Sequence, residues 1–305
     1  MSRSFDRIDA GARARTIVSR LGGRWDGHSG QCRCPAHEDR DPSLSVRLGE
    51  RAILFKCFAG CSPTEVLRAL QRAQLHDGTP LDMPTRQAPV RDLTAAARNL
   101  WRESVPIEGT LAERYLIARG IPGPHAKLRF HPRTPLGAGK DVRWLPAMLA
   151  PVENSLGLVA VQRTFLDEGD VLRRPFPNPK RLLGLPADGA VRLAPATADL
   201  GLAEGIEDAV SAAAWFDVPV WAVLGAQRYA SVAIPQTVRR VIVYADQDEA
   251  ATIGLEKALA HLEANGRQFV IRLPPSHKDW NLAWRYRRRL GGGCRGRDAA
   301  GPLSD

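Results

Sequence analysis

The sequence predicts a multidomain α/β protein, in which a small metal-binding module precedes a mixed α+β region and a C-terminal parallel α/β domain. Two close pairs of Cys and His residues between positions 34 and 61 predict the first module. From residue 199 onward, short apolar runs alternate with helical patterns, which is typical of a parallel sheet flanked by helices. The length of 305 residues predicts two or more domains.

The metal-binding module is expected to span residues 1–75. Apolar residues at helical spacing predict a helix over 8–21, which ends at Gly22-Gly23. The run Ser62-Pro-Thr-Glu65 combines an N-cap residue, a proline at the first helical position and a capping-box glutamate, so a second helix should begin at residue 63 and end near 73. Two short strands are expected between these helices, at 43–46 and 52–55.

Four residues in this module have the spacing of zinc ligands. Cys34 and His37 form one pair, and Cys57 and Cys61 form the second pair after 19 intervening residues. Each pair supplies two corners of a tetrahedron from one tight turn, and a closed set of four ligands is typical of structural zinc. Cys32 leaves a second set open, because Cys32-Arg-Cys34 would replace His37 and give four cysteines.

A proline-containing segment at 76–90 without periodicity is expected to be a linker, followed by an α+β middle region over 91–197. Helices are expected at 92–103 and 111–119, the second of them begun by a capping box at Thr110–Glu113, and strands at 127–130, 144–151, 156–166, 171–174 and 190–193.

The last domain is expected to span 198–290, before a disordered basic tail at 291–305. Its expected strands are 199–203, 219–224, 238–245 and 268–273, and its expected helices are 206–216, 228–233, 250–264 and 279–290.

Acidic residues follow two of these strands. Glu204 ends the first strand, and Asp246 and Asp248 follow a buried strand. Because ligands bind at the carboxyl ends of parallel strands, these side chains should converge at one edge, where Mg²⁺ would balance their charge. A second interpretation is that Asp208 and Asp248 only cap helices.

The Cys/His segment resembles the N-terminal zinc ribbon of bacterial and phage DNA primases. The similarity rests on Cys34-Pro-Ala-His-Glu-Asp-Arg-Asp-Pro-Ser-Leu-Ser-Val46 and on Phe55-Lys-Cys-Phe-Ala-Gly-Cys61. The second pair of that family usually has two intervening residues, whereas this chain has three, a variant that resembles the primases of phages, plasmids and mobile elements. The resemblance implies that the ribbon binds single-stranded template.

The acidic motifs resemble the Toprim domain of primases, topoisomerases and some nucleases. The resemblance implies that Glu204 acts in acid/base chemistry or metal binding, that Asp208 is the second acid of that motif, and that Asp246 and Asp248 bind the metal. Lys278-Asp-Trp-Asn281 resembles a later acidic motif, which makes Asp279 a further metal candidate, although Asn281 stands where some relatives have an acid.

Together the two resemblances imply a DNA primase-like nucleotidyltransferase of DNA replication. It would use structural Zn²⁺ for template binding and catalytic Mg²⁺, or Mn²⁺ in its place, for phosphoryl transfer from nucleoside triphosphates. The net charge of +10 favours a polyanionic partner. The candidate contacts to nucleic acid and nucleotide are Arg163, Arg173, Lys180, Arg181 and Lys278, with the arginines at 285–289 as a further group, although either set would also suit a solvated surface.

Several function classes are excluded or ranked lower. Pro135–Asp141 lacks the spacing and the Ser/Thr of a phosphate loop, so a replicative helicase would have to act in trans. No apolar run approaches a membrane span and no signal peptide is recognised, so a cytoplasmic location is expected. A Toprim nuclease and a non-catalytic single-stranded-DNA-binding replication protein remain as alternatives.

Overall fold

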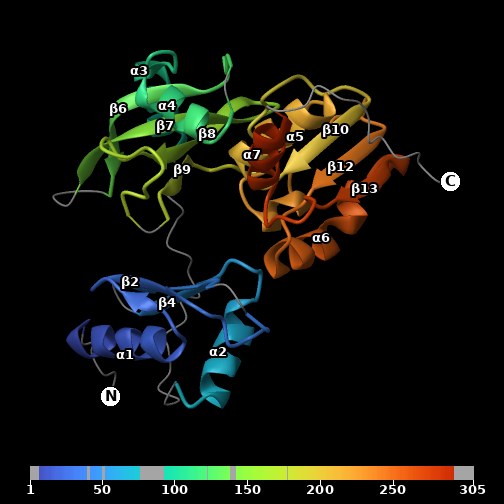
Figure 1. The fold of residues 1–305 in the computed structure, drawn as a ribbon. Coiled ribbons are helices and arrows are strands. Elements are labelled where there is room, and N and C mark those ends of the chain that lie inside the picture. Colours follow the sequence, from blue (N-terminus) through green and yellow to red (C-terminus); the bar gives the residue numbers. More distant parts are fainter. Residues whose placement is uncertain are drawn as a thin grey trace. The chain divides into compact units, whose positions relative to one another are not determined.

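The computed structural model describes residues 7–39, 42–49, 52–75, 93–121, 123–137, 142–176 and 178–291. The expected linker at 76–90 lies outside these residues, as does the expected tail apart from its first residue. The chain divides into two compact units, one formed by 1–91 with 248–259 and the other by 92–247 with 260–305. Figure 1 draws the elements of each unit and labels many of them.

The first unit contains a four-stranded antiparallel sheet in the order β1-β2-β3-β4. Its elements are α1 (Arg7–Arg20), β1 (Arg24–Trp25), β2 (Ser29–Cys32), β3 (Leu44–Leu48), β4 (Ile53–Cys57) and α2 (Pro63–Arg72). The expected helices and the two expected strands are therefore present, and β1 and β2 are additional.

Local sequence accounts for these elements. Leu44, Val46 and Leu48 alternate with more exposed residues along β3, so one face of the strand packs into the core of this unit. The capping box of α2 is present in full, because Ser62 Oγ accepts from the Glu65 backbone N–H and Glu65 accepts from the Ser62 N–H.

The middle region is built on a five-stranded antiparallel sheet in the order β5-β6-β7-β8-β9. Its elements are α3 (Thr94–Glu103), β5 (Val105–Pro106), α4 (Leu111–Ala118), β6 (Arg129–Leu136), β7 (Arg143–Asn154), β8 (Gly157–Phe165) and β9 (Lys180–Gly184).

Two expected strands of the middle region are wrong, and two strands, β5 and β9, were missed. Residues 171–174 form a turn, which Asp167 stabilises by accepting the N–H groups of Gly169 and Asp170 and the guanidinium of Arg173. Residues 190–193 contribute only isolated bridges rather than a strand. The longer of the missed strands is β9, whose polar start at Lys180 carries no apolar alternation.

The C-terminal sheet has four parallel strands in the order β11-β10-β12-β13, as the alternation of strands and helices predicts. The elements are β10 (Asp199–Ala203), α5 (Ile206–Phe216), β11 (Val220–Ala222), β12 (Arg240–Tyr244), α6 (Glu249–Leu262), β13 (Gln268–Arg272) and α7 (Trp280–Gly291). Two 3-10 turns are added, at Ala226–Ala230 and Ala264–Gly266. The turn at Ala226–Ala230 stands in place of the helix expected at 228–233. Pro235 disfavours a helical conformation of the residue before it, so the helix does not continue.

Aromatic packing fixes helices α5 and α7 beside this sheet. Trp280 is 2% exposed, and its ring meets Trp215 of α5 at 5.7 Å and Tyr244 of β12 at 5.3 Å, both nearly at right angles. Gly201 of β10 leaves room for side chains of the two flanking strands, because a Cβ there would lie 2.6 Å from Val220 of β11 and 2.8 Å from Tyr244 of β12. The contact between the rings of Trp280 and Tyr244 fixes the start of α7 relative to β12.

Candidate functional site

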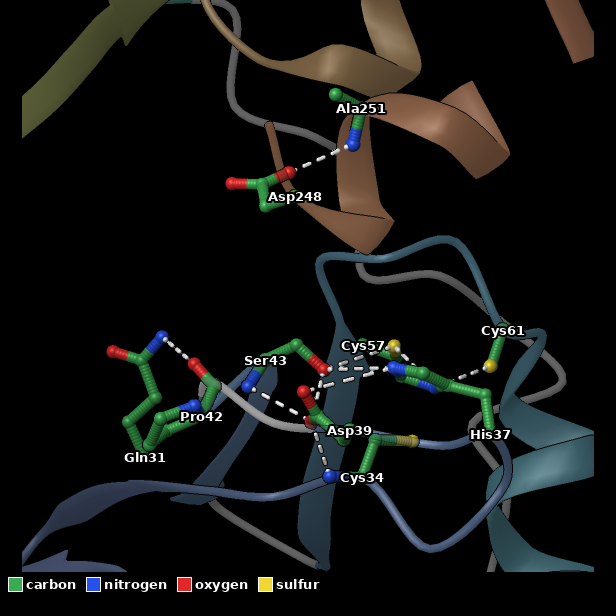
Figure 2. Close-up of polar contacts among 10 residues, drawn as sticks. All are labelled: Gln31, Cys34, His37, Asp39, Pro42, Ser43, Cys57, Cys61, Asp248 and Ala251. Atoms are coloured by element: carbon green, nitrogen blue, oxygen red, sulfur yellow. Dashed lines mark hydrogen bonds and ion pairs between the residues drawn. The ribbon is translucent and has the colours of Figure 1, made fainter. Parts of the chain in front are cut away.

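The structure brings the four predicted zinc ligands together. The ligand atoms of Cys34, His37, Cys57 and Cys61 all lie within 4.8 Å of one another (Figure 2). Cys57 ends β4, and Gly60, with a φ of 98°, allows the tight turn that returns Cys61 to the same point. The two pairs thus come from separate loops of one small module, as in structural zinc sites.

A second set of polar contacts orients this cluster. His37 Nδ1 lies 3.2 Å from Cys61 Sγ, whereas its Nε2 lies 3.5 Å from Ser43 Oγ and 3.8 Å from an Asp39 carboxylate oxygen. Asp39 also accepts the backbone N–H of Cys34 at 2.6 Å and the hydroxyl of Ser43 at 2.6 Å (Figure 2). A carboxylate behind the second ring nitrogen of histidine is a common arrangement around bound metals.

Cys32 stands outside the cluster. It is fully buried, and its thiol lies 3.7 Å from the Leu44 carbonyl oxygen, to which it donates. Burial raises the pKa of this thiol to about 12, so it stays protonated. The geometry therefore favours His37 over Cys32 as the fourth member of the set.

The chemistry of the donor set suits zinc. A hydrogen bond between the Cys34 and Cys57 thiols lowers the pKa of Cys57 to about 4 and raises that of Cys34. Sulfur atoms this close share protons when no metal is bound. A cation that replaces these protons binds the resulting thiolates and balances their negative charges. Three sulfurs and one imidazole nitrogen fit Zn²⁺, which binds such ligands at about 2.0–2.3 Å.

Glu204 and Asp246 lie at the carboxyl ends of neighbouring parallel strands. Ala203 of β10 pairs with Tyr244 of β12, so Glu204 follows the paired position by one residue and Asp246 by two. Both residues are half-buried. This register puts the two backbone positions at the same edge of the sheet, and carboxylate oxygens are the ligands that Mg²⁺ prefers. Among the described residues, the Cys/His cluster is the one group of three or more possible metal ligands, so the convergence of the acidic side chains stays a prediction.

Asp248 and Asp279 cap helices. Asp248 accepts the N–H of Ala251 at 2.9 Å in α6 (Figure 2), and Asp279 accepts the N–H of Leu282 at 2.7 Å in α7. Each of these bonds uses one oxygen of a carboxylate. Asp248 begins the segment 248–259, which belongs to the other compact unit.

Asp208 points to the start of α7. It is 9% exposed, and its carboxylate accepts the N–H of Asn281 at 2.9 Å. Burial raises the pKa of Asp208 to about 6, against the lowering effect of the Asn281 N–H, and the charge of Asp279 raises it further. Asn281 is buried as well and donates to the Arg119 carbonyl and the Ser211 hydroxyl. This carboxylate therefore joins α5 to α7.

An ion pair of a buried carboxylate with a partly exposed lysine, which sequence reasoning missed, joins the middle region to the C-terminal sheet. Glu207, in the first turn of α5, accepts Lys180 Nζ of β9 at 2.6 Å and the hydroxyl of Tyr115 of α4 at 2.5 Å. Burial would raise the pKa of Glu207, but the charge and hydrogen bonds of these partners lower it to about 2. The sequence feature that could have identified Glu207 is its position within the run Glu204-Gly-Ile-Glu-Asp208.

The basic candidates fall into three groups. Arg163 is buried in the sheet, where its guanidinium donates to the carbonyls of Pro135 and Leu182, which corrects its expected place on the surface. Arg173 and Lys180 are held in ion pairs with Asp167 and Glu207. Arg181 and Lys278 are exposed. Lys278 also lies beside the acidic edge, because its carbonyl accepts the N–H of Gln247 at 2.9 Å.

Comparison with known families covers most of the chain after residue 90. Residues 91–193 match a domain of unknown function, DUF7146, and residues 199–289 match the Toprim domain. No curated protein matches the chain in a sequence comparison. None of the helices in the described parts of the chain is long and apolar enough to cross a membrane.

Several solved primase structures are similar to the chain. The zinc-binding and RNA polymerase domains of the Aquifex aeolicus primase are 18% identical, with a TM-score of 0.45 over 96% of this chain and 86% of that one. A DnaG catalytic core is 16% identical, with a TM-score of 0.42 over 66% and 77% of the two chains. The primase fragment of the bacteriophage T7 primase-helicase is 18% identical, with a TM-score of 0.35 over 48% and 62%. The parallel sheet with Glu204 and Asp246 at its carboxyl edge and the family match agree: residues 199–289 of this chain form a Toprim domain.

Proposed function

We propose that the chain is a DNA primase-like nucleotidyltransferase, which synthesises short primers on single-stranded DNA from nucleoside triphosphates. The observation that carries this proposal is the pairing of β10 with β12 in a Toprim domain, which places Glu204 and Asp246 at one edge of the sheet. A Cys/His cluster of zinc geometry in the same chain supports a primase over other Toprim enzymes.

Glu204 and Asp246 are the proposed Mg²⁺ ligands, with Asp248 two residues further along the chain as the third and Asp279 as a further candidate. A divalent cation held there would supply charge stabilisation at the transferring phosphate. The half-buried carboxylates of Glu204 and Asp246 fit such an ion, because oxygen atoms near two neighbouring strand ends suit a hard cation.

The surrounding residues supply binding and support. Arg181 and Lys278 are exposed cations that we assign to nucleotide or template phosphates, and Arg163 is left out because it is buried. Lys180 is 42% exposed along its side chain and paired with Glu207, three residues after Glu204, so its ammonium lies close to the acidic edge. Asp208 supports the start of α7 through Asn281 rather than binding the metal.

The Cys/His cluster is proposed to hold a structural zinc ion, so that the module grips template. The folded module and the Toprim domain would act on the same strand, and any replicative helicase would be a separate protein. We also propose a cytoplasmic location and domain boundaries after residues 75, 90, 197 and 290.

The experiment that tests the proposal incubates the protein with end-labelled single-stranded DNA, Mg²⁺ and nucleoside triphosphates. Primer synthesis gives new nucleotide-dependent products, a nuclease gives shortened DNA, and a binding protein gives only a mobility shift. Asp246→Asn should lower synthesis by more than about 100-fold, since outer-shell changes alone cost 10–100-fold at metal sites.

A matched control is Asp217→Asn. Asp217 ends α5 with a φ of 53°, which asparagine tolerates, and it is exposed. The Asp217→Asn protein should synthesise primers at the rate of the parent protein. Equal activity of Asp246→Asn and the parent would refute the metal assignment.

A further inference from the structure

The last helix presents cations with no acidic partner. Arg285, Arg287, Arg288 and Arg289 lie within five residues of α7, and none of these four forms an ion pair among the residues that the structure describes. Four other cations of the second compact unit, Lys127, Arg173, Lys180 and Arg240, each pair with a carboxylate. The helix therefore carries a local excess of positive charge.

Aromatic rings hold two of these guanidinium groups in place. Arg287 lies over the ring of Trp215 at 4.5 Å, and Arg288 lies over Trp284 at 5.8 Å while donating to the Gly120 carbonyl at 3.1 Å. A guanidinium that is already ordered loses less conformational entropy when an anion binds. The guanidinium groups of Arg287 and Arg288 are therefore ordered before a ligand binds.

An exposed aromatic residue lies among these charges. Tyr286 is 52% exposed, and its ring lies 5.0 Å from the ring of His277. Leu282 and Leu290, one turn to either side of it, are 43% and 63% exposed. Exposed rings next to ordered arginines are what single-stranded nucleic acid requires, because bases stack on the rings while phosphates meet the cations.

We propose that the exposed part of α7 binds single-stranded nucleic acid. Tyr286 would stack on a base, and Arg287 and Arg289, which lie on either side of Tyr286 around the helix, would contact phosphates. This binding needs neither Mg²⁺ nor nucleotide. A purely amphipathic protein-docking helix would explain Leu282 and Leu290, but it would not explain why four arginines lie within five residues beside an exposed ring.

The test measures binding of a fluorescent oligo-dT to the full chain by anisotropy, at several salt concentrations, without Mg²⁺ or nucleotides. In Arg287→Gln/Arg289→Gln, the slope of log Kd against log salt should fall by about 1.4, since each lost phosphate contact on a single strand is worth about 0.7. Arg288 is left unchanged because it also contacts Gly120.

The matched control is Arg114→Gln/Arg239→Gln, which removes the same charge from exposed positions outside α7. It should leave the slope close to that of the parent. Tyr286→Ala should weaken oligo-dT binding at least about fivefold with an unchanged slope, because it removes stacking but no charge. Circular dichroism and thermal unfolding should be the same for all variants.

Equal loss in the two arginine pairs, or no loss in either, would overturn the proposal. So would a Tyr286→Ala protein that binds oligo-dT like the parent, or a glutamate-rich peptide that competes as well as unlabelled oligo-dT, since both results indicate a surface for any polyanion. Because this binding is measured without synthesis, it succeeds or fails independently of the proposed primase activity.

Discussion

The ion pair between Glu207 and Lys180 gives the sharpest prediction about how the middle region is joined to the Toprim domain. Replacing Glu207 by glutamine keeps the shape of the side chain and its bond to Tyr115 but removes the charge that Lys180 needs. The Glu207 side chain is only 4% exposed, so the loss falls on a buried contact. We expect Glu207→Gln to destabilise the protein at neutral pH.

The size of the effect follows from the pKa of Glu207. A fall from the ordinary 4.5 to about 2 corresponds to about 3 kcal/mol at neutral pH. Lys180 is 42% exposed along its side chain, and water screens its charge, which reduces the expected loss to about 2 kcal/mol. For a unit of this size, that loss lowers the midpoint of thermal unfolding by roughly 4–8 °C.

The assay is thermal unfolding of the intact chain, monitored by near-ultraviolet circular dichroism of the tryptophan cluster at a series of pH values. A lowered carboxyl pKa stabilises the folded state above about 4.5, and this stabilisation is lost as the pH falls toward 2. The gap between parent and Glu207→Gln should therefore narrow from pH 5 to pH 3. Tyr115→Phe removes one hydrogen bond that lowers this pKa but keeps the charge of Lys180, so its gap to the parent should be smaller and should narrow less.

Equal midpoints for parent and Glu207→Gln at pH 7 would refute this reasoning. A gap that stays constant down to pH 3 would do the same, because it would show that charge is not what the substitution removed.

Two further predictions concern the cluster and the carboxylate of α5. Removing zinc with a strong chelator should unfold the first unit and weaken template binding, and Cys57→Ser should do the same, whereas Cys32→Ser should retain one bound zinc per chain by atomic absorption. Asp208→Asn should stabilise the metal-free protein by about 1–3 kcal/mol at pH 7, since a raised carboxyl pKa costs stability as the pH rises from about 4 to about 6. The parent should lose stability across that interval in thermal melts, and an Asp208→Asn protein that loses as much would contradict the assignment.

Most of the fold could be predicted because local patterns agree with the final packing. The Toprim strands and helices alternate in both sequence and structure, and β10 and α5 begin and end at the predicted residues. The zinc ligands were predictable because tight turns constrain the spacing of Cys34 with His37 and of Cys57 with Cys61. Such short-range constraints leave a clear signature in the chain.

What sequence could not predict depends on contacts between distant segments. Strand β9 begins with Lys180, whose partner Glu207 lies 27 residues away. Arg163 resembled a surface cation, but the carbonyls of Pro135 and Leu182 draw it into the sheet. The choice between Cys32 and His37 likewise required knowing that the Cys32 thiol faces the Leu44 carbonyl.

The central claim is that Glu204 and Asp246 hold a divalent cation at the edge of the Toprim sheet. Crystals of the protein soaked in Mn²⁺ and measured at the manganese absorption edge test it directly. The account predicts an anomalous peak within about 2.3 Å of an oxygen of each carboxylate, and its loss in Asp246→Asn. A peak bound elsewhere on the domain, or one that persists unchanged in Asp246→Asn, would contradict the account.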